Sequence, residues 1–130
     1  MIVVDASAVL ELLLRTDKSD GVAAIALEPN QQLHAPELVD IEVAQTLRRL
    51  VIHKELGNER AVEVLTDYND LNIQRHSHAP LLDRIWELRD AVSAYDGAYI
   101  ALAEALDAPV VTCDGKLARS HGHGAAFVLI

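Results

Sequence analysis

Two acidic residues stand where short apolar runs end, and a carboxylate in that position can bind a metal ion or begin a helix. The run "IVV" is followed directly by Asp5, and "VVTC" is followed directly by Asp114. In an open parallel sheet, ligands bind at the carboxyl ends of the strands, and right-handed crossovers place those ends along one edge. We therefore expect Asp5 and Asp114 to lie close together although they are far apart in sequence.

Two further acids interrupt apolar, helical stretches. Glu42 stands between Ile41 and Val43 in the longest expected helix, and Asp96 opens the helix that carries the Ala-rich stretch "GAYIALAEAL". A buried carboxylate is unfavourable unless it is paired or binds a metal ion, and carboxylates that lie together raise one another's pKa unless a cation compensates. Oxygen ligands suit Mg²⁺ or Mn²⁺, and the sequence offers no His/Cys cluster for zinc. The four acids together predict a divalent-metal site.

Each acid also has a purely structural interpretation. Asp5 and Asp114 can be helix N-caps, and Asp96 can interact favourably with the dipole at the start of its helix. Glu42 can be a solvated helix residue, because Glu is mostly exposed. The conjunction favours the metal site: two acids end strands, and two lie on helices that can cover the same edge.

The rest of the pattern predicts the elements that position these acids. Short apolar runs indicate strands, and apolar residues at helical spacing indicate helices between them, with Trp86 in the core. Strands are expected at 2–5, 31–36, 72–77, 110–112 and 125–130, and helices at 6–15, 22–28, 37–54, 59–71, 79–92, 97–106 and within 115–124. This α/β alternation indicates a parallel sheet with helices on both faces. The 130 residues fit one domain.

Four stretches of the chain resemble the PIN-domain ribonucleases, and within them the VapC toxins of bacterial toxin–antitoxin pairs. They are "IVVDASAVLELLL", "LHAPELVDIEVAQTLRRL", "SAYDGAYIALAEAL" and "PVVTCDGKLAR". They occur in the order of the family and span nearly the whole chain, and "YDGAYIALAEAL" is the most specific of them. The resemblance implies a single PIN-like domain over residues 1–130. Its fold would be a three-layer α/β/α sandwich with a short, mainly parallel sheet flanked by helices.

The resemblance also implies roles for individual residues. The catalytic acidic quartet of the family, which binds Mg²⁺ or Mn²⁺, matches Asp5, Glu42, Asp96 and Asp114. Ser7 and Thr112 match polar residues that hydrogen-bond those carboxylates. Glu37 and Asp40 are rival acids for the Glu42 position, but the spacing to "LRRL" favours Glu42.

The implied function is a metal-dependent endoribonuclease that acts as the toxin of a type II toxin–antitoxin pair. A metal-activated water would hydrolyse the RNA phosphodiester. The implied partners are the RNA substrate, a cognate VapB-like antitoxin and a second copy of the chain in a homodimer. Four basic side chains are candidates for contacts with RNA phosphates, with ordinary surface charge as the alternative for each: Arg48, Arg49, Lys116 and Arg119.

The overall charge of the chain argues against RNA binding. The net charge of −9 disfavours a nucleic-acid-binding protein, because phosphate contacts need Lys and Arg. Bound divalent ions weaken that objection, since they invert the local field, and an acidic surface also suits a basic partner. A single cysteine excludes a disulfide framework. No apolar run approaches the ~20 residues of a membrane span, so we expect a cytoplasmic protein without membrane contact.

Other functions fit the residues less well. Phosphatases that carry Asp after the first strand need a second Asp two positions later, where this chain has Ser7. A catalytically silent PIN-like module that binds RNA or protein would be marked by the loss of an acid, and all four acids are present. The pairs His76/His78 and His121/His123 lack zinc ligands at the usual spacing, so we assign both to loops.

Overall fold

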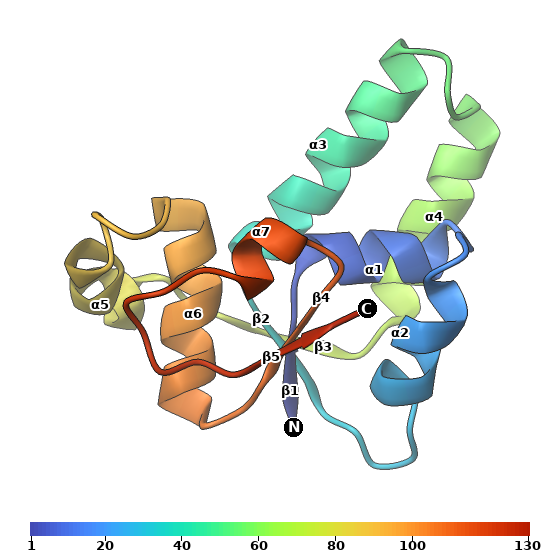
Figure 1. Cartoon of the computed structure of the whole chain (residues 1–130). Coiled ribbons are helices and arrows are strands. Elements are labelled where there is room, and N and C mark those ends of the chain that lie inside the picture. The colour runs from blue at the N-terminus through green and yellow to red at the C-terminus, as the bar shows by residue number, and fades with distance from the viewer.

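The computed structural model describes all 130 residues and places five short strands in one parallel sheet at the centre of the molecule (Figure 1). The strands are β1 (Ile2–Val4), β2 (Leu33–Pro36), β3 (Ile73–His76), β4 (Val110–Thr112) and β5 (Phe127–Leu129). Their order is β3-β2-β1-β4-β5, and all four neighbouring pairs are parallel. The order therefore reverses between β1 and β4, and the carboxyl ends of those two strands flank the crevice where ligands of such sheets bind.

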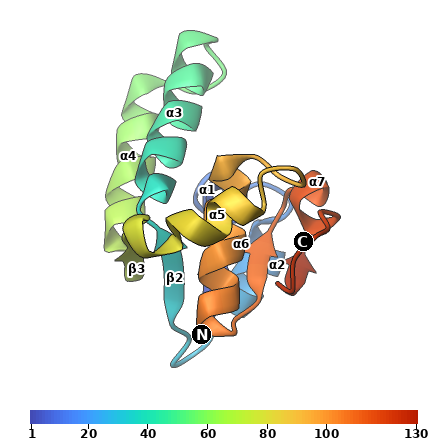
Figure 2. The same ribbon diagram turned by 90° about the vertical axis from the view of Figure 1, so that its left-hand side faces the viewer.

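Helices cover both faces of the sheet, as the α/β/α prediction requires. They are α1 (Ala6–Leu13), α2 (Ser19–Ala26), α3 (Leu38–Ile52), α4 (Asn58–Asp70), α5 (Leu82–Glu87), α6 (Ala94–Leu106) and α7 (Gly115–Ala118), with a 3₁₀ turn, η1 (Ala79–Leu81), before α5. Helices α1 and α2 lie on one face, and α5 and α6 lie on the other (Figures 1 and 2). Helices α3 and α4 form an antiparallel hairpin that projects beyond the carboxyl edge of the sheet. None of the helices combines the length and the apolar character that a bilayer crossing requires.

The central strands and α6 form the most buried part of the chain. Val3, Val110 and Val111 are fully inaccessible, because strands covered on both faces bury every side chain. Helix α6 is buried continuously from Gly97 to Ala103, and its many alanines let it pack closely on the sheet. This rigid contact fixes the start of α6 beside the carboxyl ends of β1 and β4.

The region 79–92 differs from the single helix that was predicted. It consists of a 3₁₀ turn and the six-residue helix α5, which ends at Glu87. The prediction that Trp86 belongs to the core is wrong, since 68% of its surface is exposed. Ile85 and Leu88 pack inward from this segment, and Trp86 lies on the other side of a helix too short to be covered by neighbours.

Helix α6 begins at Ala94, three residues before the expected range of 97–106. Ser93 is its N-cap, and the Ser93 hydroxyl accepts a hydrogen bond from the Asp96 N–H at 3.2 Å. Asp96 is therefore the third residue of the helix instead of its opening residue. Its side chain remains in the first turn, where a carboxylate interacts favourably with the helix dipole.

A histidine pair, buried His34 and half-buried His76, joins β2 to β3, so the assignment of His76 to a loop is wrong. The Nδ1 atom of His34 lies 2.9 Å from Nε2 of His76, so one ring donates a proton to the other, and Nε2 of His34 has no partner. His78 caps the neighbouring helix, because its Nε2 accepts a hydrogen bond from the Leu38 N–H at 3.0 Å. Burial, reinforced by the charge of His76, lowers the pKa of His34 below its usual value of 6.5.

This lowered pKa predicts that the protein is less stable in mild acid. The unfolded chain takes up a proton at His34 more readily than the folded protein, so the free energy of unfolding falls as the pH drops below about 6.5. One proton limits the slope to about 1.4 kcal/mol per pH unit. Urea unfolding at several pH values between ~7.5 and ~5.5 measures how the free energy of unfolding depends on pH. His34→Leu should flatten the dependence, and the exposed-site control His121→Gln should not; an unchanged slope in His34→Leu would contradict the assignment.

Candidate active site

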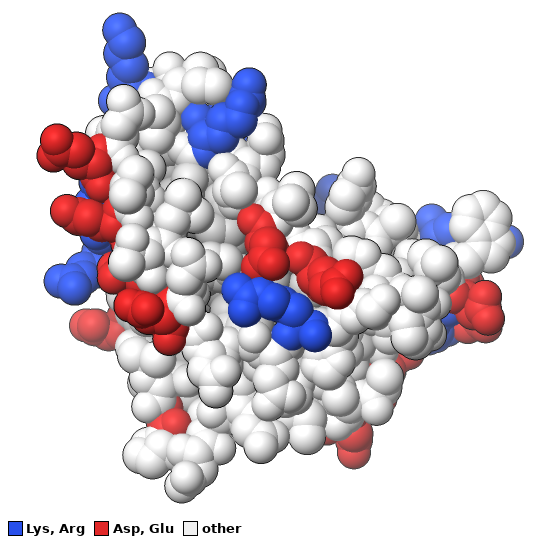
Figure 3. Space-filling model, turned by 180° about the vertical axis from the view of Figure 1, so that it is seen from behind, with Lys and Arg blue, Asp and Glu red and all other residues white.

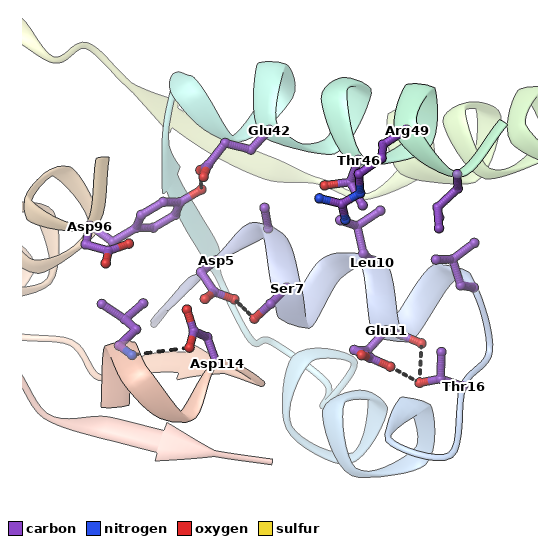
Figure 4. Close-up of a pocket in the computed structure, with 15 residues that line it drawn as sticks. Asp5, Ser7, Leu10, Glu11, Thr16, Glu42, Thr46, Arg49, Asp96 and Asp114 are labelled. Atoms are coloured by element: carbon purple, nitrogen blue, oxygen red, sulfur yellow. Dashed lines mark hydrogen bonds between the residues drawn. The ribbon is translucent and has the colours of Figure 1, made fainter. Parts of the chain in front are cut away.

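A pocket of about 420 Å³ opens at the carboxyl edge of the sheet, between α1, α3, α6 and α7 (Figure 4). All four predicted acids line it: Asp5, Glu42, Asp96 and Asp114. They come from four different elements, and Figure 4 shows Asp5, Asp96 and Asp114 pointing toward one space, with Glu42 reaching in from α3. The topological switch point between β1 and β4 therefore gathers acids that are distant in sequence.

Asp5 is the most enclosed of these acids, with 5% of its surface exposed. Its Oδ1 accepts hydrogen bonds from the Ser7 hydroxyl at 2.7 Å and from the Ala8 N–H at 2.9 Å, and its Oδ2 accepts one from the Thr112 hydroxyl at 2.5 Å. Burial raises the pKa of Asp5, the three hydrogen bonds oppose that rise, and nearby Asp114 adds to it. Asp5 is thus both the N-cap of α1 and a wall of the pocket.

The hydroxyls of Ser7 and Thr112 link the ends of β1 and β4. Each donates to Asp5 and also accepts a backbone hydrogen bond: Ser7 from the Cys113 N–H and Thr112 from the Asp114 N–H, both at 2.9 Å. Thr112 is fully buried. The resemblance implied that these two residues hydrogen-bond the acidic quartet. In the structure, both hydroxyls donate to Asp5, and Thr112 also accepts a hydrogen bond from the backbone of Asp114.

Asp114 and Asp96 leave carboxylate oxygens free toward the pocket. Oδ1 of Asp114 caps α7 by accepting from the N–H groups of Lys116 at 2.9 Å and Leu117 at 3.4 Å, and its Oδ2 has no protein partner. The Asp96 carboxylate makes no hydrogen bond to protein. Burial and then the charge of Asp114 raise the pKa of Asp96, and Lys116 opposes the rise.

Tyr99 holds Glu42, a contact that the sequence analysis did not identify. The Tyr99 hydroxyl, on α6, donates to Oε1 of Glu42, on α3, at 2.7 Å, and Tyr99 is 2% exposed. Burial raises the pKa of Glu42; the bond from Tyr99 lowers it, and the charges of Asp5 and Asp96 raise it further. The sequence could have pointed to this contact, because Tyr99 lies inside a continuously buried helix. A buried phenol needs a hydrogen-bond partner.

The rival acids Glu37 and Asp40 do not line the pocket. Oδ1 of Asp40 accepts hydrogen bonds from Arg75 and from the Tyr68 hydroxyl on the far side of α3. Glu37 is exposed just before the first turn of α3. Of these three acids, only Glu42, which the spacing to "LRRL" favours, lines the pocket.

Comparison with known proteins identifies the family. The PIN domain family matches residues 2–121. The chain belongs to the PIN-domain family.

Within this family the chain is similar to VapC proteins over nearly its whole length. It is 38% identical over 130 residues to Ribonuclease VapC12 of Mycobacterium tuberculosis, which covers 100% of this chain and 99% of the relative. It is 45% identical over 117 residues to VapC ribonuclease Mb0985 of Mycobacterium bovis, with coverages of 90% and 88%. The predicted resemblance to VapC-type PIN ribonucleases is confirmed.

The three-layer fold prediction is confirmed as well. The crystal structure of PAE2754 from Pyrobaculum aerophilum superimposes with a TM-score of 0.69 at 20% identity and covers 98% of this chain and 83% of that one. A likeness at this level of identity concerns the fold. The parallel sheet flanked by helices is thus the PIN architecture, with its crevice at the carboxyl ends of β1 and β4.

The acids of this PIN domain have the chemistry of a hard-cation site. None of the four forms an ion pair with Lys or Arg, and free oxygens remain on Glu42, Asp96 and Asp114. Burial first, and then the charges of neighbouring acids, raise the pKa of Asp5, Glu42 and Asp96, and a bound cation would offset both effects. No three His, Cys, Asp or Glu side chains converge closely enough to hold an ion on their own. The donors are carboxylate oxygens, which suit Mg²⁺ or Mn²⁺, and an ion held by so few protein ligands would keep several water ligands.

The candidate RNA-contacting residues occupy different places in this PIN domain. Arg49 lines the pocket from α3, whereas Arg48, its neighbour, does not. Lys116 lies beside Asp96, in an adjacent hollow. Arg119 lies with its guanidinium against Gly115 on α7. Only Arg49 and Lys116 therefore border the acids, and basic side chains form no continuous surface on the face shown in Figure 3.

Proposed function

We propose that this chain is a Mg²⁺- or Mn²⁺-dependent endoribonuclease and the toxin of a type II toxin–antitoxin pair. The observation that carries the proposal is the meeting of four acids, unpaired with any basic side chain, in one pocket at the switch point of the sheet. The names of relatives that match nearly the whole chain, Ribonuclease VapC12 among them, support RNA as the substrate.

Asp5 and Asp96 are our first choice as direct metal ligands, and Asp114 and Glu42 complete the site partly through water. When bound, the ion lowers the pKa of a coordinated water and polarises the scissile phosphate. Ser7 and Thr112 fix the orientation of Asp5 by hydrogen bonds to both of its oxygens. Oε2 of Glu42 and Oδ2 of Asp114 accept hydrogen bonds from water and orient it for in-line attack.

This route has a distinctive product. The leaving group is the 3′ oxygen of the ribose, and no step uses the 2′-hydroxyl of the substrate. Cleavage therefore leaves 5′-phosphate and 3′-hydroxyl ends, in contrast to the 2′,3′-cyclic phosphate of a metal-independent transesterification. A single 2′-deoxy substitution at the cleavage position should still permit cutting.

The test is cleavage of a structured RNA pool with Mg²⁺ or Mn²⁺, with and without EDTA, by the wild-type protein and by Asp5→Asn and Asp96→Asn. Metal-dependent cleavage that both substitutions abolish, with 5′-phosphate products, supports the proposal. Cleavage that survives EDTA or both substitutions contradicts the metal mechanism. RNA binding without any cleavage would instead support a catalytically silent PIN-like module.

The proposal extends to partners and location. Residues 1–130 act as one domain, in the cytoplasm, neutralised by a VapB-like antitoxin and paired in a homodimer. The acidic chain, with a net charge of −9, suits a partner segment that is basic. Size-exclusion chromatography with light scattering measures the oligomeric state, and co-purification with the product of a neighbouring small gene tests the antitoxin.

Tyr99→Phe tests whether Tyr99 positions Glu42. The substitution keeps the ring packed in α6 and removes only the hydroxyl that bonds Glu42. We expect the affinity for Mn²⁺ in the absence of RNA to fall about 10-fold or more, the range for partners that orient ligands. Calorimetric titration of Mn²⁺ measures this without relying on activity. Tyr95→Phe, at an exposed tyrosine on the same helix, is the matched control; equal affinities in all three proteins would contradict the role.

A further inference from the structure

Trp86 presents an exposed aromatic surface on α5. It is 68% exposed, although tryptophan is mostly well buried in folded proteins. The Arg89 guanidinium lies 4.8 Å from the centre of the indole ring, and Arg89 Nη1 donates to the Trp86 carbonyl at 3.0 Å. This contact fixes the orientation of the ring from one side and leaves the rest of the indole surface open.

Arg89, which packs on the ring of Trp86, lines a second hollow that extends to one of the acids, Asp96. Its volume is about 510 Å³, and its polar lining comprises Arg89, Asp90, Ser93, Asp96, Lys116 and Ser120. Asp96 lines both this hollow and the pocket of the four acids, so the two depressions meet at its carboxylate. The hollow lies between α7 and the segment that joins α5 to α6.

The cations of this hollow are available for a ligand. Neither Arg89 nor Lys116 forms an ion pair, whereas Arg84 of the same segment is bound by Glu87 and Glu104. Asp90 is the acid in the lining that opposes them, besides Asp96 itself. An exposed indole and two unpaired basic groups are the combination that binds single-stranded nucleic acid, with bases stacked on aromatic rings and phosphates held by cations.

We propose that this hollow, with Trp86, Arg89 and Lys116, binds the RNA nucleotide that flanks the scissile phosphate on the α5 side. The base of that nucleotide stacks on the open face of Trp86, and its phosphate contacts Arg89 and Lys116. The proposal rests on the proposed ribonuclease function and specifies how the strand crosses the site. It gives a chain of net charge −9 two unpaired cations beside the acids, Arg89 and Lys116, that can contact RNA phosphates.

The single tryptophan makes the proposal directly measurable. Trp86 is the only tryptophan in the chain, so intrinsic indole fluorescence reports on this position alone. We expect single-stranded RNA to quench this fluorescence in saturable fashion. An RNA of the same length whose flanking nucleotide is abasic keeps its phosphates but should quench much less. Measuring in EDTA prevents cleavage during the titration.

Substitutions separate stacking from general electrostatics. Trp86→Leu should weaken RNA binding, measured by anisotropy of labelled RNA, by about 5- to 150-fold, the range for loss of one stacked base. Trp86→Phe should restore most of it. Arg89→Gln should weaken binding more than Lys54→Asn, which removes the same charge at the exposed turn between α3 and α4. These side chains are exposed, so the variants are expected to fold, and circular dichroism checks this.

The outcomes distinguish this subsite from the ribonuclease proposal. Quenching that disappears with the abasic RNA, together with weaker binding by Trp86→Leu, supports the subsite even if no cleavage is found. Normal cleavage and binding by Trp86→Leu, with fluorescence indifferent to RNA, overturns the subsite and leaves the ribonuclease proposal intact. Fluorescence that changes with protein concentration and not with RNA also overturns it, in favour of a contact between two copies of the chain.

Discussion

Asp96→Asn is expected to reduce RNA cleavage at least about 100-fold while making the metal-free protein more stable. A partner that only orients a ligand is worth 10- to 100-fold, and a direct ligand should exceed that. The gain in stability follows from the raised pKa of Asp96. A carboxyl with a raised pKa destabilises the fold in its charged form, so stability is lost as the pH rises from its usual value of 3.8 through the raised one. The neutral amide avoids that loss.

Thermal unfolding in EDTA, from neutral pH downward, measures the effect. The thermal midpoint of Asp96→Asn should exceed that of the wild type at pH ~7, and the difference should shrink as the pH approaches the usual Asp value. Mn²⁺ should raise the midpoint of the wild type and have much less effect on the variant. Asp67→Asn, at an exposed acid of α4, is the charge-matched control and should change neither property. A less stable Asp96→Asn protein at neutral pH would contradict this account.

Thr112→Val is expected to damage both the fold and the site. The two side chains have nearly the same shape, but valine leaves Oδ2 of Asp5 and the N–H of Asp114 without the hydroxyl that bonds both. Thr112 is fully buried, so water cannot replace it. Leaving buried polar groups unsatisfied costs about 1–3 kcal/mol, and loss of a group that orients a ligand lowers activity about 10- to 100-fold.

Chemical denaturation and cleavage kinetics measure these two effects separately. Thr66→Val is the control, because the Thr66 hydroxyl bonds only a carbonyl on the exposed side of α4. Ser7→Ala should resemble Thr112→Val in activity but lose less stability, since Ser7 is only partly buried. A Thr112→Val protein of unchanged stability would show that the hydroxyl does not hold the ends of β1 and β4 together.

The acids could be found from sequence because each breaks a local pattern. Asp5 and Asp114 end apolar strands, and Glu42 interrupts an apolar helix, so each signal lies in its neighbours along the chain. For two of them, the structural role is compatible with the proposed chemical one. Asp5 and Asp114 each cap a helix and line the pocket as well.

Features that depend on helix length and rotation could not be predicted. Trp86 was misplaced because an apolar side chain in an amphipathic stretch is normally core, and nothing local shows that α5 ends at Glu87. Arg48 and Arg49 are adjacent in sequence, and only the rotation of α3 about its axis decides which one faces the pocket. The bond from Tyr99 to Glu42 joins two helices whose relative placement the chain alone does not specify.

Asp5 and Asp114 each cap a helix and line the pocket, so we expect two kinds of inactive variant. A change that removes either cap weakens a helix start by about 0.5–2 kcal/mol, enough to lower the amount of protein that survives quality control in a cell. Glu42 and Asp96 cap nothing, so chains altered there should accumulate as intact, inert copies. Such variants suit affinity capture of a binding partner, because they would keep the folded surface and lack the proposed cleavage activity.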